Sequence, residues 1–167
     1  MLETCLTPGQ RQSENIPAPN RLPGAWGFPE KRAWLSTREI SETLRVTRRH
    51  VIRLIEEGSF ECVIDLKAPG ADQAFWRVAR FAFTRFGQRA RGETCGRLQL
   101  DAELNHALAV YPNTLTSLEL AAHFHCSKQH IYHLATELAN VGTMDAERSL
   151  LRVSRVEVVA WIKRRMV

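Results

Sequence analysis

The sequence predicts an α+β fold, mainly α-helical, built from two tandem copies of one small domain behind a flexible N-terminal tail. The first observation is an internal repeat. Residues 35–54 read LSTREISETLRVTRRHVIRL, and residues 115–134 read LTSLELAAHFHCSKQHIYHL. The two segments align at an offset of 80 residues without a gap, and ten positions match in size or chemistry. A long unit that occurs twice differs from a solenoid, which needs three or more short units.

Length and charge agree with two small domains. A chain of 167 residues can hold one domain or two, and copies of about 55–70 residues lie near the lower limit for folding without a metal or disulfide. The formal net charge of +5 and the pI of about 9.4 fit an anionic partner. Residues 34–92 hold 11 Lys and Arg against 7 Asp and Glu, whereas residues 93–167 hold 8 of each. The first copy therefore carries the basic character.

Residues 1–32 differ in composition from the rest of the chain. They contain five of the seven prolines, with many Gly, Gln, Ser and Asn residues. Such a segment buries too little apolar surface to offset its ordering entropy, so we expect a flexible Pro-rich tail. Trp26 and Phe28 are expected either to dock on the folded part or to form a partner-binding patch. We place the first copy at residues 33–92, a linker with a short helix at 93–113, and the second copy at 114–167.

Each copy is predicted to begin with two short helices. Ser36 to Glu39 and Thr116 to Glu119 fit the capping-box pattern, in which a hydroxyl caps an amide and the glutamate reaches back to the cap. The first helices are expected over residues 37–44 and 117–124. After a tight turn, the second helix begins at the N-cap residues Thr47 and Ser127. Its inward stripe is Val51, Leu54 and Ile55 in the first copy, and Ile131, Leu134 and Leu138 in the second. Gly58 and Gly142 are the expected breakers.

A β-hairpin is predicted after these helices. In the first copy, residues 60–66 and 74–78 are rich in β-formers and flank a loop that contains Pro69 and Gly70. In the second copy the strands are shorter, at residues 141–144 and 150–153. The offset between the copies falls there to 75, because the second loop is five residues shorter.

Each copy closes with an apolar segment. Ser154 to Glu157 is a third capping box and predicts a helix through Ile162. The counterpart at residues 80–86 fits either a helix or a strand. Residues 101–110 are expected to form the connecting helix, which Pro112 stops.

Two helices joined by a short turn and followed by a hairpin describe a winged helix-turn-helix, whose second helix fits the DNA major groove. In the first copy, the face opposite the apolar stripe carries Arg49 and Arg53, and Arg48 and His50 lie in the first turn. Arginine forks match guanine edges or phosphate oxygens. The equivalent, less cationic face of the second copy holds Lys128, Gln129, His130, Tyr132 and His133.

A longer pattern joins these features: L-[ST]-x-x-E-[IL], then [ST]-[RK]-x-H-[VI]-x-x-L, then W-R-V-x-R. At these residues the chain resembles the excisionase and MerR type of DNA-binding module, over residues 35–86 and 115–164. The resemblance implies a recognition helix in the major groove and a wing near the DNA backbone, with Arg77 and Arg152 at the wing-strand arginine position. Lys67 in the first wing is a further candidate phosphate contact. The long first wing departs from the family, and the dimerising half of a MerR regulator is not expected.

The sequence therefore predicts a sequence-specific double-stranded DNA-binding protein, either a transcription regulator or an excisionase-like recombination directionality factor. Integrase, RNA polymerase and a second copy of the chain are further candidate partners. The alternative is a non-enzymatic adaptor or oligomerisation module, which the neutral second copy favours for its own half. No enzyme and no cofactor are expected, because the chain has no Gly-rich phosphate loop, no G-x-S-x-G and no suggestive carboxylate pair.

Metal and membrane sites are not expected either. The four cysteines have no C-x-x-C spacing and are predicted to be reduced thiols. His123, His125, His130 and His133 with Cys126 suggest a metal, but only one of the aligned positions in the first copy is a ligand type, so Cys126 is predicted to be a small core residue. No apolar run is long enough to cross a membrane and no signal peptide is predicted. The expected location is the cytoplasm, on the nucleoid if DNA is bound.

Overall fold

The computed structural model describes residues 32–134, 143–145 and 150–167. About half of these residues are helical, and two small antiparallel sheets complete the fold, so the α+β class is confirmed. The expectations for the tail before Arg32 and for Trp26, Phe28, Leu138 and Gly142 lie outside the described residues.

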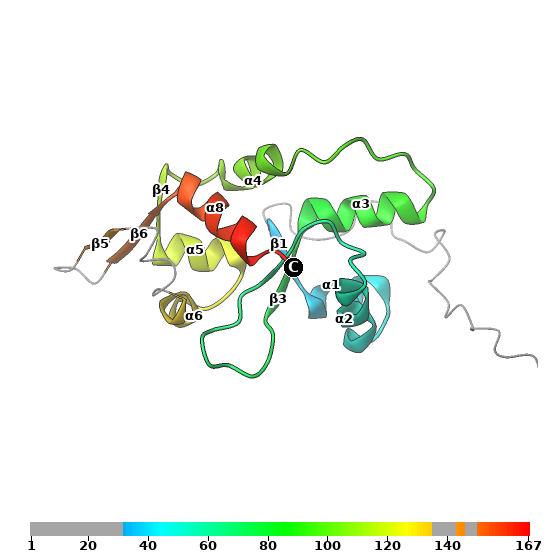
Figure 1. Cartoon of the computed structure of the whole chain (residues 1–167), viewed down its shortest axis with the longest axis horizontal. Coiled ribbons are helices and arrows are strands. Elements are labelled where there is room, and N and C mark those ends of the chain that lie inside the picture. Colours follow the sequence, from blue (N-terminus) through cyan, green and yellow to red (C-terminus); the bar gives the residue numbers. More distant parts are fainter. Residues whose placement is uncertain (1–31, 135–142, 146–149) are drawn as a thin grey trace, which may run out of the picture.

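The first copy has the element order β-α-α-β-β-α (Figure 1). Its elements are β1 (Trp34–Ser36), α1 (Thr37–Leu44), α2 (Arg48–Glu56), β2 (Val63–Asp65), β3 (Trp76–Ala79) and α3 (Arg80–Ala90). The strands pair antiparallel in the order β1-β3-β2. Residues 80–86, for which the sequence fitted either a helix or a strand, are helical. We call β2, β3 and their connection the first hairpin.

The second copy repeats this order after a connecting helix. Its elements, with the connecting helix first, are α4 (Leu100–Leu108), β4 (Thr114–Thr116), α5 (Ser117–Phe124), α6 (Lys128–His133), β5 (Thr143–Asp145), β6 (Leu150–Ser154) and α8 (Arg155–Arg165). The strand order is β4-β6-β5. Leu35 pairs with Val78, and Leu115 pairs with Val153. The register therefore confirms the offset of 80 residues in the first strand and 75 in the last.

Local backbone chemistry explains why both copies fold alike. All three capping boxes are present: the hydroxyls of Ser36, Thr116 and Ser154 accept from the backbone amide three residues on, and the glutamate there accepts from the cap. Helices α1 and α5 both end at a left-handed residue, Arg45 or His125, each with φ of 55°. Few non-glycine residues adopt this conformation, so its occurrence at equivalent positions supports one shared turn.

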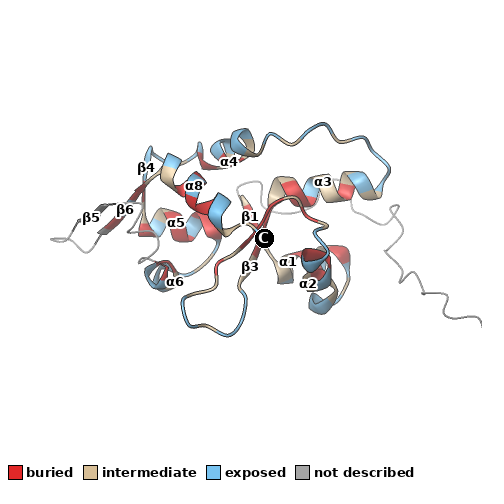
Figure 2. Ribbon diagram, viewed as in Figure 1, coloured by how far each residue is buried: buried red, intermediate tan, exposed pale blue. Residues whose placement is uncertain are grey.

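One hydrophobic core runs through both copies. The ring of Trp34 in β1 lies 5.9 Å from that of Phe124 in α5, which lies 5.5 Å from that of Trp161 in α8, measured between centroids. Figure 2 shows buried residues on α5, α8 and the strands of the first copy where these elements meet. The sequence predicts two small domains, each of which would have its own core, but the structure has one core that both copies share. A unit of this size buries only a limited part of its own apolar surface. The two copies therefore cover each other's aromatic rings.

No helix among the described residues is long and apolar enough to span a bilayer.

Candidate nucleic-acid interface

Helix α2 has an apolar inner face and a basic outer face. Val51, Leu54 and Ile55 are buried, as the sequence predicts. Arg48, Arg49 and Arg53 are exposed. The inner face fixes the helix in the core, so the three guanidinium groups are presented from a rigid support.

The first turn of α2 is set by its cap. The Thr47 hydroxyl accepts a hydrogen bond from the His50 amide at 3.3 Å. Arg53 lies with its Nη2 3.2 Å from His50 Nδ1 and its Nε 3.9 Å from a Glu57 carboxylate oxygen. Exposed pairs of this kind contribute little and are readily exchanged for a phosphate. Arg53 is therefore available to an anionic partner without loss of core contacts.

Helix α6 is the counterpart of α2 in the second copy. Ile131 and Leu134 are buried beneath it, whereas Lys128, Gln129, Tyr132 and His133 are exposed. The Lys128 ammonium lies 5.4 Å from the centroid of the Tyr132 ring. The outer face of α6 is thus polar and aromatic, with a single Lys in place of three arginines.

His130 contacts the first hairpin. Its Nε2 lies 2.7 Å from the carbonyl oxygen of Leu66, and its ring lies 4.6 Å from that of Phe75. His130 is half-buried. Its sequence equivalent, His50, lies beside Arg53 instead. The histidine that both copies of the repeat share therefore lies in two different environments.

The resemblance placed Arg77 among the residues that contact DNA, but the residue is only 6% exposed. Its Nε donates to the Phe124 carbonyl at 3.0 Å, its Nη2 donates to the His125 carbonyl at 2.9 Å, and its guanidinium lies 4.1 Å from the centroid of Phe75. Burial lowers the pKa of this guanidinium. The second copy covers the first hairpin at this point, so the guanidinium of Arg77 is engaged within the protein and little of it is presented to a DNA partner.

Arg152 holds the same register position in the second sheet. Arg77 pairs with Ser36, and Arg152 pairs with Thr116. Arg152 is exposed. Of the two arginines that the family pattern indicates, only that of the second copy lies on the surface.

Lys67 is half-buried at the base of the hairpin connection. Its backbone amide donates to Asp65 Oδ1 at 2.9 Å, and the same oxygen accepts from the Phe75 amide at 2.7 Å. The Lys67 carbonyl accepts from Arg165 at 3.1 Å. The connection is thus tied to its own strand and to the second copy.

An open groove of about 620 Å³ separates α2 from the first hairpin. Its basic lining residues are Arg38 and Arg48, which are exposed, and the buried Arg77, beside Ile52, Gln73 and Trp76. Sequence reasoning missed Arg38, which belongs to α1. Its signal was present, because it lies one turn before Glu42 on the exposed side of the helix, where the two form an ion pair at 2.7 Å.

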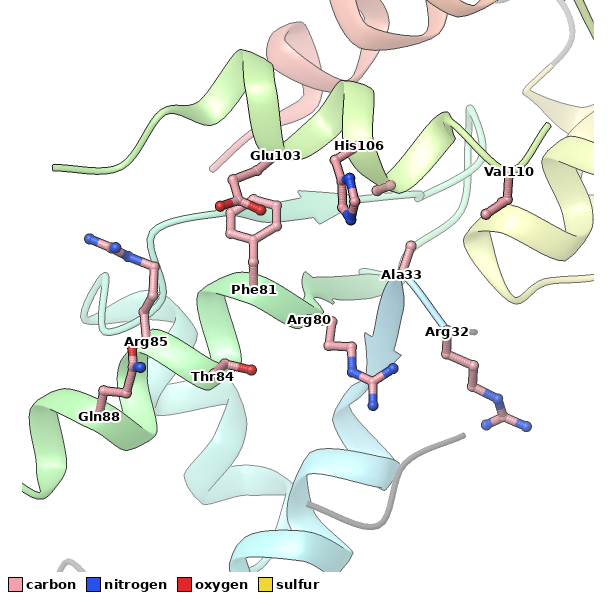
Figure 3. Close-up of a pocket in the computed structure, with 11 residues that line it drawn as sticks. Arg32, Ala33, Arg80, Phe81, Thr84, Arg85, Gln88, Glu103, His106 and Val110 are labelled. Carbon is pink, nitrogen blue, oxygen red and sulfur yellow. The ribbon is translucent and has the colours of Figure 1, made fainter. Parts of the chain in front are cut away.

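A second pocket of about 580 Å³ lies between α3 and α4 (Figure 3). It is lined by Arg32, Arg80, Phe81, Arg85, Glu103 and His106, among others. Arg32 is paired with Glu39, and Arg85 is paired with Glu61, which also forms an ion pair with Arg89. In Figure 1, α3 and α4 lie on the upper side, away from α2 and α6. We therefore do not include this pocket in the candidate interface.

His123 faces the interior. It is buried, and its Nε2 accepts a hydrogen bond from Trp34 Nε1 at 3.0 Å. Burial lowers its pKa to about 4 and raises that of the half-buried Cys126 thiol to about 11. Within the described ranges, no three His, Cys, Asp or Glu residues are grouped so that they could hold a metal ion. The role that the structure gives His123 is a contact between the copies.

Comparison of the chain with protein-family models, curated proteins and solved structures gives no match. We therefore base the function on the residues and geometry described above.

Proposed function

We propose that the chain is a double-stranded DNA-binding protein made of two winged helix-turn-helix units, with α2 as the main recognition helix. The observation that carries the proposal is the row of exposed arginines Arg48, Arg49 and Arg53 on a helix held by the core. Guanidinium groups form bidentate contacts with guanine edges and phosphates. An α-helix with such a row fits the width of the major groove.

The arrangement of the elements supports one DNA-facing side. In Figure 1, α2, α6 and the connection of the first hairpin all lie on the lower side of the molecule. The second unit adds Lys128, Gln129, Tyr132, His133 and Arg152, which are exposed. His50 and Lys67 remain candidate contacts at the edge of this surface. A protein of this kind acts by occupying or bending a site, either in transcription or as a recombination directionality factor.

Salt dependence of binding tests this proposal. The binding of the full chain to a fluorescently labelled duplex of random sequence is measured by fluorescence anisotropy between roughly 50 and 200 mM salt. About three to five phosphate contacts from the exposed arginines and lysines give a log–log slope of about −3 to −5, because each contact releases a counterion. A flat titration, or no binding at low salt, contradicts the proposal.

A second candidate function, a protein adaptor, is favoured by one observation on the second copy. The outer side of α5 carries Leu118, which is 67% exposed, beside a groove lined by Ala121, Ala122 and Cys126. The first copy has Arg38, Ser41 and Glu42 at the positions of Leu118, Ala121 and Ala122. Self-association that is measured by sedimentation and lost in Leu118→Glu, together with a flat salt titration, would favour the adaptor over DNA binding.

A further inference from the structure

We infer that the two copies form one rigid DNA-reading body, held by Arg77 as a positioning residue, and that its substrate is a single continuous duplex with two contacted blocks at a fixed separation. This inference rests on the proposed function and adds to it the kind of site that is bound.

Arg77 joins the first hairpin to the end of α5. It donates to the carbonyls of Phe124 and His125, the last residue of α5 and the one after it, and a third hydrogen bond goes to the Trp76 carbonyl at 3.0 Å. The C-terminal end of a helix presents unpaired carbonyls and a partial negative charge, which a buried cation complements. The planar guanidinium also stacks on Phe75. These contacts fix the angle and not only the distance between the hairpin and α5.

Two further contacts connect the copies through other elements. Trp34 of β1 donates to His123 of α5, and His130 of α6 contacts the Leu66 carbonyl and the Phe75 ring. His130 belongs to the first turn of α6. The helix that would read DNA in the second copy is therefore oriented by the hairpin of the first.

The end of the second copy returns to the first sheet. Met166 forms a β-bridge with Ile64, and the Val167 amide donates to the Val63 carbonyl at 3.1 Å. Arg165 Nη1 donates to the carbonyls of Asp65 and Lys67 at 2.9 and 3.1 Å. The second copy thus holds the first hairpin from α5 and α6 and also from the residues at the end of α8. Two domains on a flexible linker would leave these carbonyls to water.

A rigid connection has a consequence for the DNA. The blocks that α2 and α6 contact must keep one separation and one helical phase, since B-DNA turns once in about 10–10.5 base pairs. About five extra base pairs would place the second block on the opposite side of the duplex. Arg77 is engaged by the second copy, so the wing-strand arginine contact falls to Arg152.

Selection of duplexes from a random pool by the full chain tests the inference. We expect the selected sequences to align in two blocks with one constant gap. Lengthening that gap by about five base pairs should lower wild-type affinity at least about tenfold, which is the loss of one good base contact. Arg77→Met removes the hydrogen bonds to the carbonyls of Phe124 and His125 but keeps a long apolar side chain. The ratio of the affinities for the selected gap and the lengthened gap should then approach one. Arg97→Met, which changes an exposed arginine in the connection before α4 and outside the candidate interface, should leave that ratio unchanged.

Each outcome decides between the two claims. Failure of every duplex to bind overturns both the DNA-binding proposal and the inference. Selected sequences that share only one block, or two blocks with variable gaps, overturn the inference and leave the DNA-binding proposal intact. A fixed gap whose ratio is the same in the wild type and Arg77→Met overturns the positioning role of Arg77. The gap series on wild-type protein needs no variant, so it stands even if circular dichroism shows that Arg77→Met is unfolded.

Discussion

Arg77 and Arg152 occupy the same register position in the two sheets and have opposite environments. Arg77 is buried with three backbone carbonyls as acceptors, whereas Arg152 is exposed. A buried guanidinium is stabilising only where its N–H groups are satisfied. The second copy supplies two of the three carbonyls. Whether the buried guanidinium of Arg77 stabilises the fold therefore depends on how the two copies pack together.

We predict that Arg77→Ala lowers the free energy of unfolding by about 2–4 kcal/mol, because the buried hydrogen bond to the Phe124 carbonyl and the partly buried one to the His125 carbonyl are lost. Chemical denaturation with circular dichroism measures the change. Arg152→Ala is the matched control and should alter stability by less than about 0.5 kcal/mol. Equal losses in the two variants would show that Arg77 does not hold the copies together.

We predict that the burial of His123 lowers the free energy of unfolding of the chain in mild acid. Its pKa is about 4 in the folded chain and 6.5 in the unfolded chain, because burial opposes the charged imidazolium. The unfolded state therefore binds the extra proton first. The contribution of neutral His123 to the free energy of unfolding is complete above pH 6.5. It falls as the pH drops towards 4, by up to about 3 kcal/mol.

Denaturation curves between pH 7 and 4 on the wild type and on His123→Gln check this. Gln retains an oxygen that can accept from Trp34 and does not titrate, so the variant should lose less stability across this window. The exposed His133→Gln should behave as the wild type. Parallel curves for the wild type and His123→Gln would refute the prediction.

At the scale of elements, α2 and α6 share one framework and differ on their outer faces. Both begin at a hydroxyl cap, and Val51 and Leu54 are buried as Ile131 and Leu134 are, yet α2 presents Arg49 and Arg53 where α6 presents Gln129 and His133. Outer-face residues do not contribute to the core. The two helices can therefore fold alike and contribute differently to binding.

We predict that Arg49→Ala and Arg53→Ala each weaken DNA binding by about 1–3 kcal/mol when they remove a bidentate base contact. Gln129→Ala and His133→Ala should cost less affinity and alter sequence preference more. Competition binding of the four variants, with melting curves as the folding control, measures this. A larger loss of affinity from the α6 variants would reverse the roles that we assign to the two helices.

At the scale of the whole molecule, the continuous core predicts one cooperative unit. Trp34, Phe124 and Trp161 lie in one cluster that spans both copies. Opening either copy would expose aromatic surface of the other. The copies should therefore unfold together even though they repeat in sequence.

We predict that urea unfolding gives a single transition, with the same midpoint by tryptophan fluorescence and by far-ultraviolet circular dichroism. A chain that ends at residue 97, in the connection before α4, removes the second copy and should unfold at a lower midpoint or fail to fold. Two separated transitions in the full chain, or a stable fragment with an unchanged midpoint, would show that the copies are independent.

Local chemistry made most of the elements predictable from the sequence. The capping boxes at Ser36, Thr116 and Ser154 and the N-caps of α2 and α6 depend on neighbouring residues, so the helix starts were predicted correctly. The change of offset from 80 to 75 followed from the length of one loop. Residues 80–86 were ambiguous because three phenylalanines at F-x-F-x-x-F spacing fit both periods, and packing as α3 against the core decided between them.

The sequence by itself determined the repeat, the order of elements within each copy and the basic outer face of α2, because each depends on residues close together in the chain. Only the tertiary structure decided that the copies share a core, that Arg77 is buried while Arg152 is exposed, and that His130 contacts the first hairpin. These features depend on contacts between residues about 50 to 100 positions apart. Equivalent residues in a repeat have equal local surroundings, but the two copies are not equally covered, since each packs a different side against the other.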